Sequence, residues 1–346
     1  MRPLPRWWIR LRHWEYWPMQ VVYLPVLCYY LWLSLKARSL AFFTVANPAI
    51  PNSGFVDDPK SAFHHLFPAH LQPVTLELGR FPGREAALDA IGNAGLTFPV
   101  MAKPDVGERG FLVHKLDTPS DLRRLAAYPQ VQWLIQEYVR YPLEISVLYY
   151  RIPGKPSGTI SSLTLKIHLS VTGDGRRTIA GLVRAYPRAW LQWEAIRKEH
   201  PEWETHIPAD GEKWVLVPVG NHARGAMFLN GAAHITPALT QVFDELAGRL
   251  DGVYFGRFDL MCASIEALEQ GRDFKIIEWN GAKSEPVHIY DPNYPIWKAW
   301  RDLFRHWRAL YEVSVANIRA GHRPMRFLAL LALMRQHVRG KRAQSS

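Results

Sequence analysis

The spacing of apolar positions at the two ends of the chain predicts helices. No charged residue occurs from Tyr16 to Leu35, and the part from Trp17 onward is long enough to approach a hydrocarbon core of ~30 Å as a helix. Pro18 and Pro25 can break or kink that helix. Near the other end, apolar residues recur at helical spacing with arginines between them, at Trp297, Trp300, Phe304, Trp307, Tyr311, Val315 and Ile318. Gly321 and Pro324 end this helix, and a second apolar helix is predicted from Met325 to Val338.

Between the ends, short helical and strand-like stretches alternate. Residues 83–94 predict a helix closed by Gly95, and residues 98–101 predict a strand that brings Lys103 to its end. Thr118 and Pro119 predict the start of another helix. Further strands are predicted at residues 132–135, 144–150, 161–169, 254–261 and 275–280. The pattern indicates an α+β fold class.

Length and composition favour one large domain with appendages. The chain has 346 residues and a hydrophobic content of 48%, which is ample for a sizeable core. Its two cysteines, Cys28 and Cys262, form neither a CxxC pair nor a disulfide framework. We therefore expect a reducing compartment and two inert thiols in the core.

The formal charge of +11 is divided unevenly. Residues 1–45 carry six Lys and Arg against Glu15 alone, and residues 293–346 carry eleven against Asp302 and Glu312, so the middle is slightly acidic. Basic ends rich in Trp and Tyr favour contact with an anionic membrane surface. A nucleic-acid groove would more often place its charge on the folded domain, so a nucleic-acid partner is not expected.

The apolar run is compatible with a spanning helix, an anchor lying in the plane of the membrane, or a buried core helix. The basic residues before it favour a cytoplasmic N-terminus, and one span would then export everything downstream. An exported domain would lack the nucleotide argued for below. We therefore favour an in-plane or re-entrant anchor on a cytoplasmic protein associated with the inner face of the membrane. The sequence of the C-terminal helices is equally compatible with two arrangements. They can pack on the core with a solvated basic face, or they can contact lipid.

The middle of the chain contains residues suited to a nucleotide. A loop with Gly107 and Gly110 follows Lys103, and such loops can present backbone N–H groups to phosphates beside a lysine. A strand-to-strand hinge at Gln136, Glu137, Tyr138 and Val139, followed by Glu144, suits adenine and ribose. Lys166 is either a charge at the rim or a second phosphate contact. Each of these signals is weak alone.

Two predicted strands carry a set of residues suited to a metal. Alternate residues of a strand share a face, so Arg257 and Asp259 point together, as do Glu278 and Asn280. If the strands pair, an arginine, two carboxylates and an amide meet on one surface. Mg²⁺ takes one or two carboxylates plus substrate phosphates. A surface ion-pair cluster is the alternative, but acidic residues among Phe255, Phe258 and Ile276 would be costly without a cation.

Together these residues resemble the ATP-grasp superfamily, and within it D-alanine:D-alanine ligase-like proteins, across roughly 210 of the 346 positions. Val100-Met-Ala-Lys103-Pro with its glycine loop is similar to the family's first phosphate-binding lysine and lid. Glu137 and Glu144 are similar to its adenine-hinge and ribose carboxylates, and Lys166 to its second phosphate lysine. Gly-Arg-Phe-Asp and Glu-Trp-Asn resemble its magnesium strands, which makes Asp259, Glu278 and Asn280 the expected ligands.

The resemblance implies two α+β subdomains that clasp ATP. It also implies two Mg²⁺ ions, which would neutralise the phosphates of ATP. ATP would phosphorylate a small-molecule carboxylate, and an amine or another nucleophile would displace phosphate, with Arg257 and Lys166 stabilising the transferred group. The expected division is a membrane-associated segment at residues 1–45, a connecting region at 46–83, the ATP-grasp domain at 84–292 and basic amphipathic helices at 293–346.

The chain departs from the D-alanine ligases in two places. Only residues 46–83 stand where those enzymes have a full N-terminal domain, and Gly281-Ala-Lys-Ser-Glu-Pro286 replaces the expected substrate-facing sequence. D-alanine is therefore not the expected substrate. Two alternatives to a ligase stay open: a kinase-like phosphotransferase that uses the same ATP site, and a membrane-bound nucleotide-binding protein without turnover.

Overall fold

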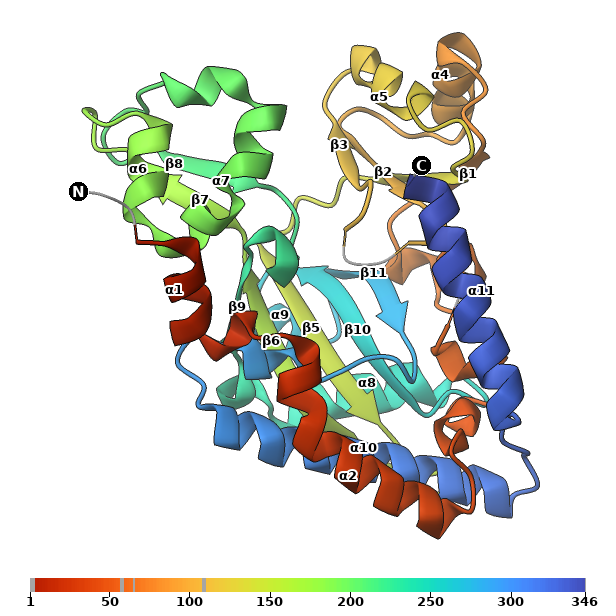
Figure 1. The fold of residues 1–346 in the computed structure, drawn as a ribbon. Coiled ribbons are helices and arrows are strands. Elements are labelled where there is room, and N and C mark those ends of the chain that lie inside the picture. Colours follow the sequence, from red (N-terminus) through yellow and green to blue (C-terminus); the bar gives the residue numbers. More distant parts are fainter. Residues whose placement is uncertain (1–3, 57–58, 65, 108–109, 346) are drawn as a thin grey trace.

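A computed structural model describes residues 4–56, 59–64, 66–107 and 110–345, with side chains described up to residue 339. Figure 1 shows two upper lobes above a central sheet, with long helices along the lower edge. The fold class predicted from the sequence is confirmed. The chain is α+β, its sheets are antiparallel, an apolar helix lies near the N-terminus and two helices form the C-terminus.

The first lobe is built on a four-stranded sheet in the order β1-β4-β2-β3. Its strands are β1 (Thr75–Gly79), β2 (Val100–Pro104), β3 (His114–Leu116) and β4 (Trp133–Glu137), covered by α4 (Arg84–Asn93) and α5 (Arg123–Ala126). Their core includes Ile91, Leu116 and Trp133. β2 extends beyond the predicted residues 98–101 because Lys103 pairs with Leu134 and Pro104 with Trp133. Lys103 therefore lies inside the strand.

The central sheet has five strands in the order β11-β10-β5-β6-β9. They are β5 (Leu143–Tyr150), β6 (Thr159–Ile167), β9 (Met227–Asn230), β10 (Phe255–Cys262) and β11 (Phe274–Asn280). Neighbouring residues of β5 point to opposite faces. Val147 enters a core with Phe243 of α8 (Pro237–Gly248) and Leu268 of α9 (Ile265–Glu269). Leu148 faces the long helices on the other side.

The second upper lobe is a small unit inserted between β6 and β9. It contains β7 (Leu169–Thr172), β8 (Lys213–Val217), α6 (Ile179–Ala185) and α7 (Pro187–Glu199) around Val183, Trp193 and Leu216. The single strand predicted at residues 161–169 is wrong at its end. The chain leaves the central sheet after Ile167, and Leu169 begins a strand that pairs with β8.

The terminal helices pack against the central sheet and against each other. α1 (Arg6–Arg12) leads into α2 (Met19–Ala37), which lies beside α10 (Ile296–Arg319) along the lower edge in Figure 1. Trp300 Nε1 donates to the Val22 carbonyl at 2.9 Å, and the Tyr30 and Trp307 rings are 5.1 Å apart. α3 (Ser61–His64) is a single turn, and α11 (Phe327–Ser345) contains the predicted residues 325–338 apart from the first two.

Within the described residues, no helix combines the length and apolarity required to cross a bilayer. Pro25 lies inside α2 while Pro18 precedes it, so neither interrupts the helix. Cys262 is buried as expected, but the expectation of a core thiol is wrong for Cys28, which is exposed on α2. β1 belongs to the predicted connecting region of residues 46–83 but pairs with β4 of the first sheet. The proposed domain boundaries remain a prediction.

Candidate functional site

A cleft of about 750 Å³ lies between the two upper lobes and the central sheet. Its lining includes all thirteen residues selected from the sequence: Lys103, Gly107, Gly110, Gln136, Glu137, Tyr138, Val139, Glu144, Lys166, Arg257, Asp259, Glu278 and Asn280. The two sheets thus bring together residues that are far apart in the chain.

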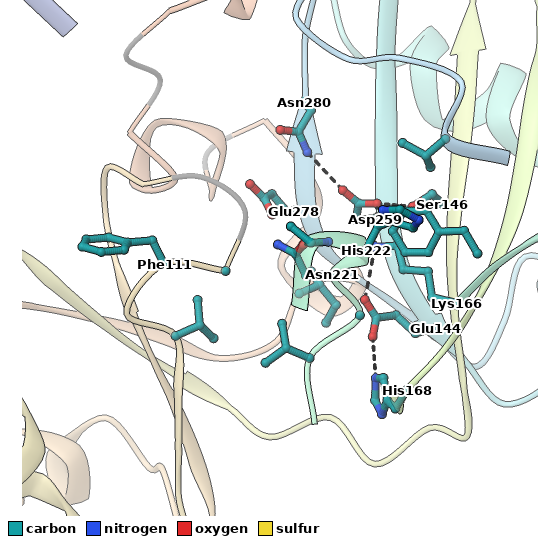
Figure 2. A pocket seen from close by; sticks show the side chains of 18 of the residues that line it. Phe111, Glu144, Ser146, Lys166, His168, Asn221, His222, Asp259, Glu278 and Asn280 are labelled. Carbon is teal, nitrogen blue, oxygen red and sulfur yellow. Dashed lines mark hydrogen bonds and ion pairs between the residues drawn. The ribbon is translucent and has the colours of Figure 1, made fainter. Parts of the chain in front are cut away.

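Asp259 is the centre of a dense polar cluster on the central sheet. Antiparallel pairing of β10 with β11 sets Arg257 opposite Asn280, and Asp259 opposite Glu278. Asp259 Oδ2 accepts from Arg257 Nη2 at 3.0 Å and from Asn280 Nδ2 at 3.0 Å. Its Oδ1 accepts from the Ser146 hydroxyl and lies 3.0 Å from Lys166 Nζ. Figure 2 shows Ser146, Lys166 and Asn280 around Asp259.

The surroundings of Asp259 decide its charge. Burial alone would raise the pKa of this carboxyl, but Arg257 and Lys166 outweigh burial and hold the pKa well below its usual range. Asp259 is therefore a carboxylate under all ordinary conditions.

Lys166 is held between two carboxylates. Its Nζ lies 3.1 Å from Glu144 Oε1 and 3.0 Å from Asp259 Oδ1. Glu144 Oε2 in turn lies 2.9 Å from His168 Nε2 (Figure 2). Burial lowers the pKa of Lys166, but the carboxylates of Asp259 and Glu144 raise it by a larger amount, so the pKa lies above its ordinary value. Lys166 thus remains a fixed positive charge.

Lys103 lies across the cleft in the first sheet and has a different environment. It is 8% exposed, and its Nζ donates to the Gln136 side chain, which also donates to Thr75 Oγ1 at 3.0 Å. Burial lowers the pKa of Lys103 to about 8, and the Glu278 carboxylate offsets only part of that effect. A buried lysine whose close partner is a neutral amide is suited to an anionic ligand.

The glycine loop after β2 is held by a lysine that sequence analysis missed. Lys60 Nζ donates to the carbonyls of Pro104 at 3.0 Å and Gly107 at 2.8 Å. Gly110 has a φ of +69°, a conformation that favours glycine. The intervening residues 108 and 109 lie outside the described residues. Both glycines face the cleft together with Phe111.

The predicted adenine hinge is the end of β4. Glu137 forms two hydrogen bonds with Val74. Its backbone N–H donates to the Val74 carbonyl at 2.8 Å, and its carboxylate accepts from the Val74 N–H at 3.1 Å. Glu137 is therefore tied to the edge of the first sheet. Tyr138 and Val139 continue from it along the cleft wall.

The residues at β10 and β11 form a partial fit to Mg²⁺. Two carboxylates and an amide oxygen are the donor types that this cation prefers. Asp259 already accepts from Arg257, Lys166, Ser146 and Asn280, so binding a metal would require it to exchange a partner. In the described part of the chain, His, Cys, Asp and Glu side chains nowhere gather in a group of three that could hold a metal. Asn280 and the phosphates of a nucleotide would have to complete the set.

Other residues of the cleft were missed because they come from segments with no recognisable motif. Gly220, in the segment between β8 and β9, lies in close contact with the Glu144 carboxylate. A Cβ on Gly220 would lie 2.2 Å from Glu144 Oε1, so a larger residue here would have to displace the Glu144 carboxylate from Lys166 and His168. Glu15 and Tyr16, expected to belong to a membrane-associated segment, also line the cleft.

The segment after β11 divides between two places. Lys283, Ser284, Glu285 and Tyr290 line the cleft. The Glu285 carboxylate accepts from the Tyr23 hydroxyl of α2 and from the Tyr290 hydroxyl at 3.1 Å. His288 instead lies in a second cavity, with Ser162 Oγ 2.7 Å from its Nδ1 and Asp302 Oδ2 3.2 Å from its Nε2.

Comparison with known proteins gives structural similarities at low sequence identity. No protein-family model matches the chain, and comparison with curated proteins finds no match. The chain is similar to a bifunctional glutathione synthetase from Pasteurella multocida, with 15% identity and a TM-score of 0.35, over 71% of this chain and 36% of that one.

Two further similarities are of the same order. A VanG D-Ala:D-Ser ligase from Enterococcus faecalis has 15% identity and a TM-score of 0.39, over 73% of this chain and 61% of that one. A carboxyaminoimidazole ribonucleotide synthase from Aspergillus clavatus, complexed with ATP, has 10% identity and a TM-score of 0.39, over 66% and 46%.

The chain therefore spans between about one third and three fifths of the length of these proteins. TM-scores this low do not establish a common fold over whole chains.

Proposed function

We propose that the chain is an ATP- and Mg²⁺-dependent ligase that activates a small-molecule carboxylate as an acyl phosphate. The observation that supports this best is the pair of lysines on opposite walls of one cleft, Lys103 and Lys166. Asp259 lies 3.0 Å from Lys166 and 3.0 Å from Arg257 in the same cleft. Such a site presents positive charge from the first lobe and from the central sheet to one polyanionic ligand.

The first step transfers the terminal phosphoryl group of ATP to the carboxylate. A carboxylate oxygen forms a bond to the γ-phosphorus, the bond to the ADP oxygen breaks, and ADP leaves. Lys103, Lys166 and Arg257 stabilise the negative charge on the phosphate oxygens and orient them for in-line attack. Mg²⁺ held by Asp259, Glu278 and Asn280 would neutralise the phosphates.

The second step is attack by the nucleophile on the acyl carbon. The new bond forms at the carbonyl, phosphate leaves with the electrons of the broken C–O bond, and an amine nucleophile loses a proton. Glu285, oriented by Tyr23 and Tyr290, is the carboxylate placed to bind an amine on this side of the cleft. Its location supports a nucleophile that binds as an ammonium ion and loses a proton before it attacks, over an alcohol.

The test is ADP release across a panel of amino acids, peptides and other carboxylates, with mass spectrometry of the products. We expect ADP release to need Mg²⁺, a carboxylate and a nucleophile, and Glu278→Gln to lower it by about a hundredfold or more. Glu278 is half-buried on the cleft wall, so this substitution should leave the fold intact.

Product analysis separates the alternatives. A phosphorylated final product would identify a phosphotransferase, and nucleotide binding without any ADP release would identify a protein without turnover. Unchanged turnover in both Asp259→Asn and Glu278→Gln would contradict the proposed metal ligands.

The sequence-based hypothesis also places the reaction at an anionic membrane surface in the cytoplasm. That part stays a proposal, and it depends on exposed faces of the terminal helices rather than on the cleft.

A further inference from the structure

One face of α2 is apolar and exposed. Val22, Val26 and Leu33 are buried against the body of the protein. The opposite side presents Val21, Leu24, Leu27, Leu31, Trp32 and Leu35, which are 45 to 78% exposed. These residues recur at three- and four-residue spacing and form one continuous stripe along the helix. An exposed apolar stripe of this size marks a contact surface.

The stripe carries no charge over most of its length, because the segment from Tyr16 to Leu35 contains no charged residue. A solvated helix face normally mixes charged residues with apolar ones. Lys36 stands at the end of the stripe, with its Nζ 4.4 Å from the centre of the Trp32 ring.

α10, the helix beside α2, carries a row of exposed arginines. The two helices run in parallel, since Trp300 contacts Val22 near their beginnings and Tyr311 lies 5.7 Å from Lys36 Nζ near the end of α2. Arg301, Arg305 and Arg308 line the second cavity, and their side chains are 47, 71 and 69% exposed. Asp302 and Glu312 pair with these arginines, so part of their charge is balanced. Trp297, 59% exposed, lies at the start of the same helix.

From this combination we propose that α2 and α10 dock the protein on an anionic phospholipid bilayer, with α2 lying in the plane of the surface. The apolar stripe would enter the boundary between headgroups and acyl chains. The arginines would contact anionic headgroups while their stems cover apolar surface, and Trp297 would lie at the interface. Because the inner side of α2 is packed on the protein, only its outer side is available to lipid. This surface is independent of the nucleotide cleft.

The test is sedimentation of the full chain with vesicles at low ionic strength. We expect it to bind vesicles of phosphatidylglycerol mixed with equal phosphatidylcholine, and to bind pure phosphatidylcholine at least about tenfold more weakly. Raising the salt to about 0.5 M should reduce binding to the anionic vesicles, because the Debye length falls to a few ångströms.

Matched substitutions locate the surface. Leu24→Glu with Leu31→Glu should reduce vesicle binding by about tenfold or more. Ile207→Glu is the control, since Ile207 is 50% exposed on the small upper lobe, away from both helices, and it should bind like the natural chain. Circular dichroism and thermal melting would show that each variant is folded.

Two results would overturn the proposal. One is a folded natural chain that stays in solution with anionic vesicles. The other is a stable dimer, seen by light scattering, that the Leu24→Glu and Leu31→Glu substitutions dissociate, because the stripe would then contact a second copy of the chain.

Discussion

Two lysines on opposite walls of the cleft are both buried but have different electrostatic surroundings. Lys166 has two carboxylates within 3.1 Å, and its pKa is raised. Lys103 has the neutral Gln136 amide as its hydrogen-bond partner, and its pKa falls to about 8. Lys166 therefore keeps its charge with or without a ligand, whereas the charge of Lys103 depends on pH and on an arriving anion.

This difference predicts the pH dependence of nucleotide binding. Below pH 8 Lys103 already carries its proton in the free protein, so an anion binds without proton uptake. Above pH 8 binding must take up a proton, and we expect affinity to fall by up to about tenfold per pH unit. Isothermal titration with a non-hydrolysable ATP analogue between pH 7 and pH 10 would measure this slope.

Lys103→Arg is the control for that experiment, because a guanidinium stays protonated throughout the range. Its absolute affinity can differ from that of the natural chain, so only the slopes are compared. A slope in the natural chain no steeper than in Lys103→Arg would show that Lys103 does not contact the nucleotide.

At the residue scale, the sequence identified side chains whose chemistry is unusual for their position. Lys103, Asp259 and Asn280 fall in apolar strand patterns, where a polar residue needs a reason, and all three lie in the cleft. Lys60 and His168 were missed because a single Lys or His in a loop is ordinary. Only the tertiary contacts with Gly107 and Glu144 distinguish them.

At the scale of elements, the N-terminal segment has two parts with different partners. α2 packs along α10, while the turn before it carries Glu15 into the small upper lobe. There Glu15 accepts two bonds from Arg188 Nη2, at 2.7 and 2.8 Å, and lies 2.8 Å from His222 Nε2. Both side chains of the Glu15–Arg188 pair are almost fully buried. This pair ties the N-terminal segment to the lobe.

We predict that Glu15→Gln destabilises the protein by about 3 to 5 kcal/mol, because it leaves the Arg188 guanidinium buried without its counter-charge. Thermal or urea unfolding near neutral pH would measure the loss. Arg197→Ala is the control, since its pair with Glu194 is about half-exposed and should contribute little.

The same pair gives an acid dependence. Burial raises the pKa of Glu15, but His222 and Arg188 outweigh it, so the pKa lies below its ordinary value of 4.5. The stabilisation is therefore complete above that value and declines as the pH falls through the folded-state pKa. In Glu15→Gln, the free energy of unfolding should no longer contain this contribution that declines at low pH. An equal stability of the natural chain and Glu15→Gln at neutral pH would rule out the tie.

Sequence patterns predicted elements well where one periodicity persists. The helical stripe from Trp297 to Ile318 lies within α10, and the strands around Asp259 and Glu278 match β10 and β11. The end of the strand predicted at 161–169 was wrong because Leu165, Ile167 and Leu169 continue the alternation while the chain changes sheets. Alternation alone does not say which partner a strand takes.

At the scale of the whole molecule, the cleft is assembled from four separate parts of the chain. The two sheets supply the lysines and the acidic cluster, the small lobe supplies the loop around Gly220, and the N-terminal segment supplies Glu15 and Tyr16. The small lobe and the N-terminal segment were not predicted to contribute to this site, because the Arg188–Glu15 contact that joins them spans 173 positions. No local pattern records such contacts.

The central claim is that this cleft holds a nucleotide through Lys103 and Lys166 and a divalent ion through Asp259, Glu278 and Asn280. Titrating the natural chain and Glu278→Gln with a non-hydrolysable ATP analogue, with and without Mg²⁺, tests it most directly. We predict one nucleotide per chain, tighter binding with Mg²⁺, and a Glu278→Gln variant that keeps the Mg²⁺-free affinity but loses the gain from Mg²⁺. Absence of binding, or the same gain from Mg²⁺ in both proteins, would contradict it.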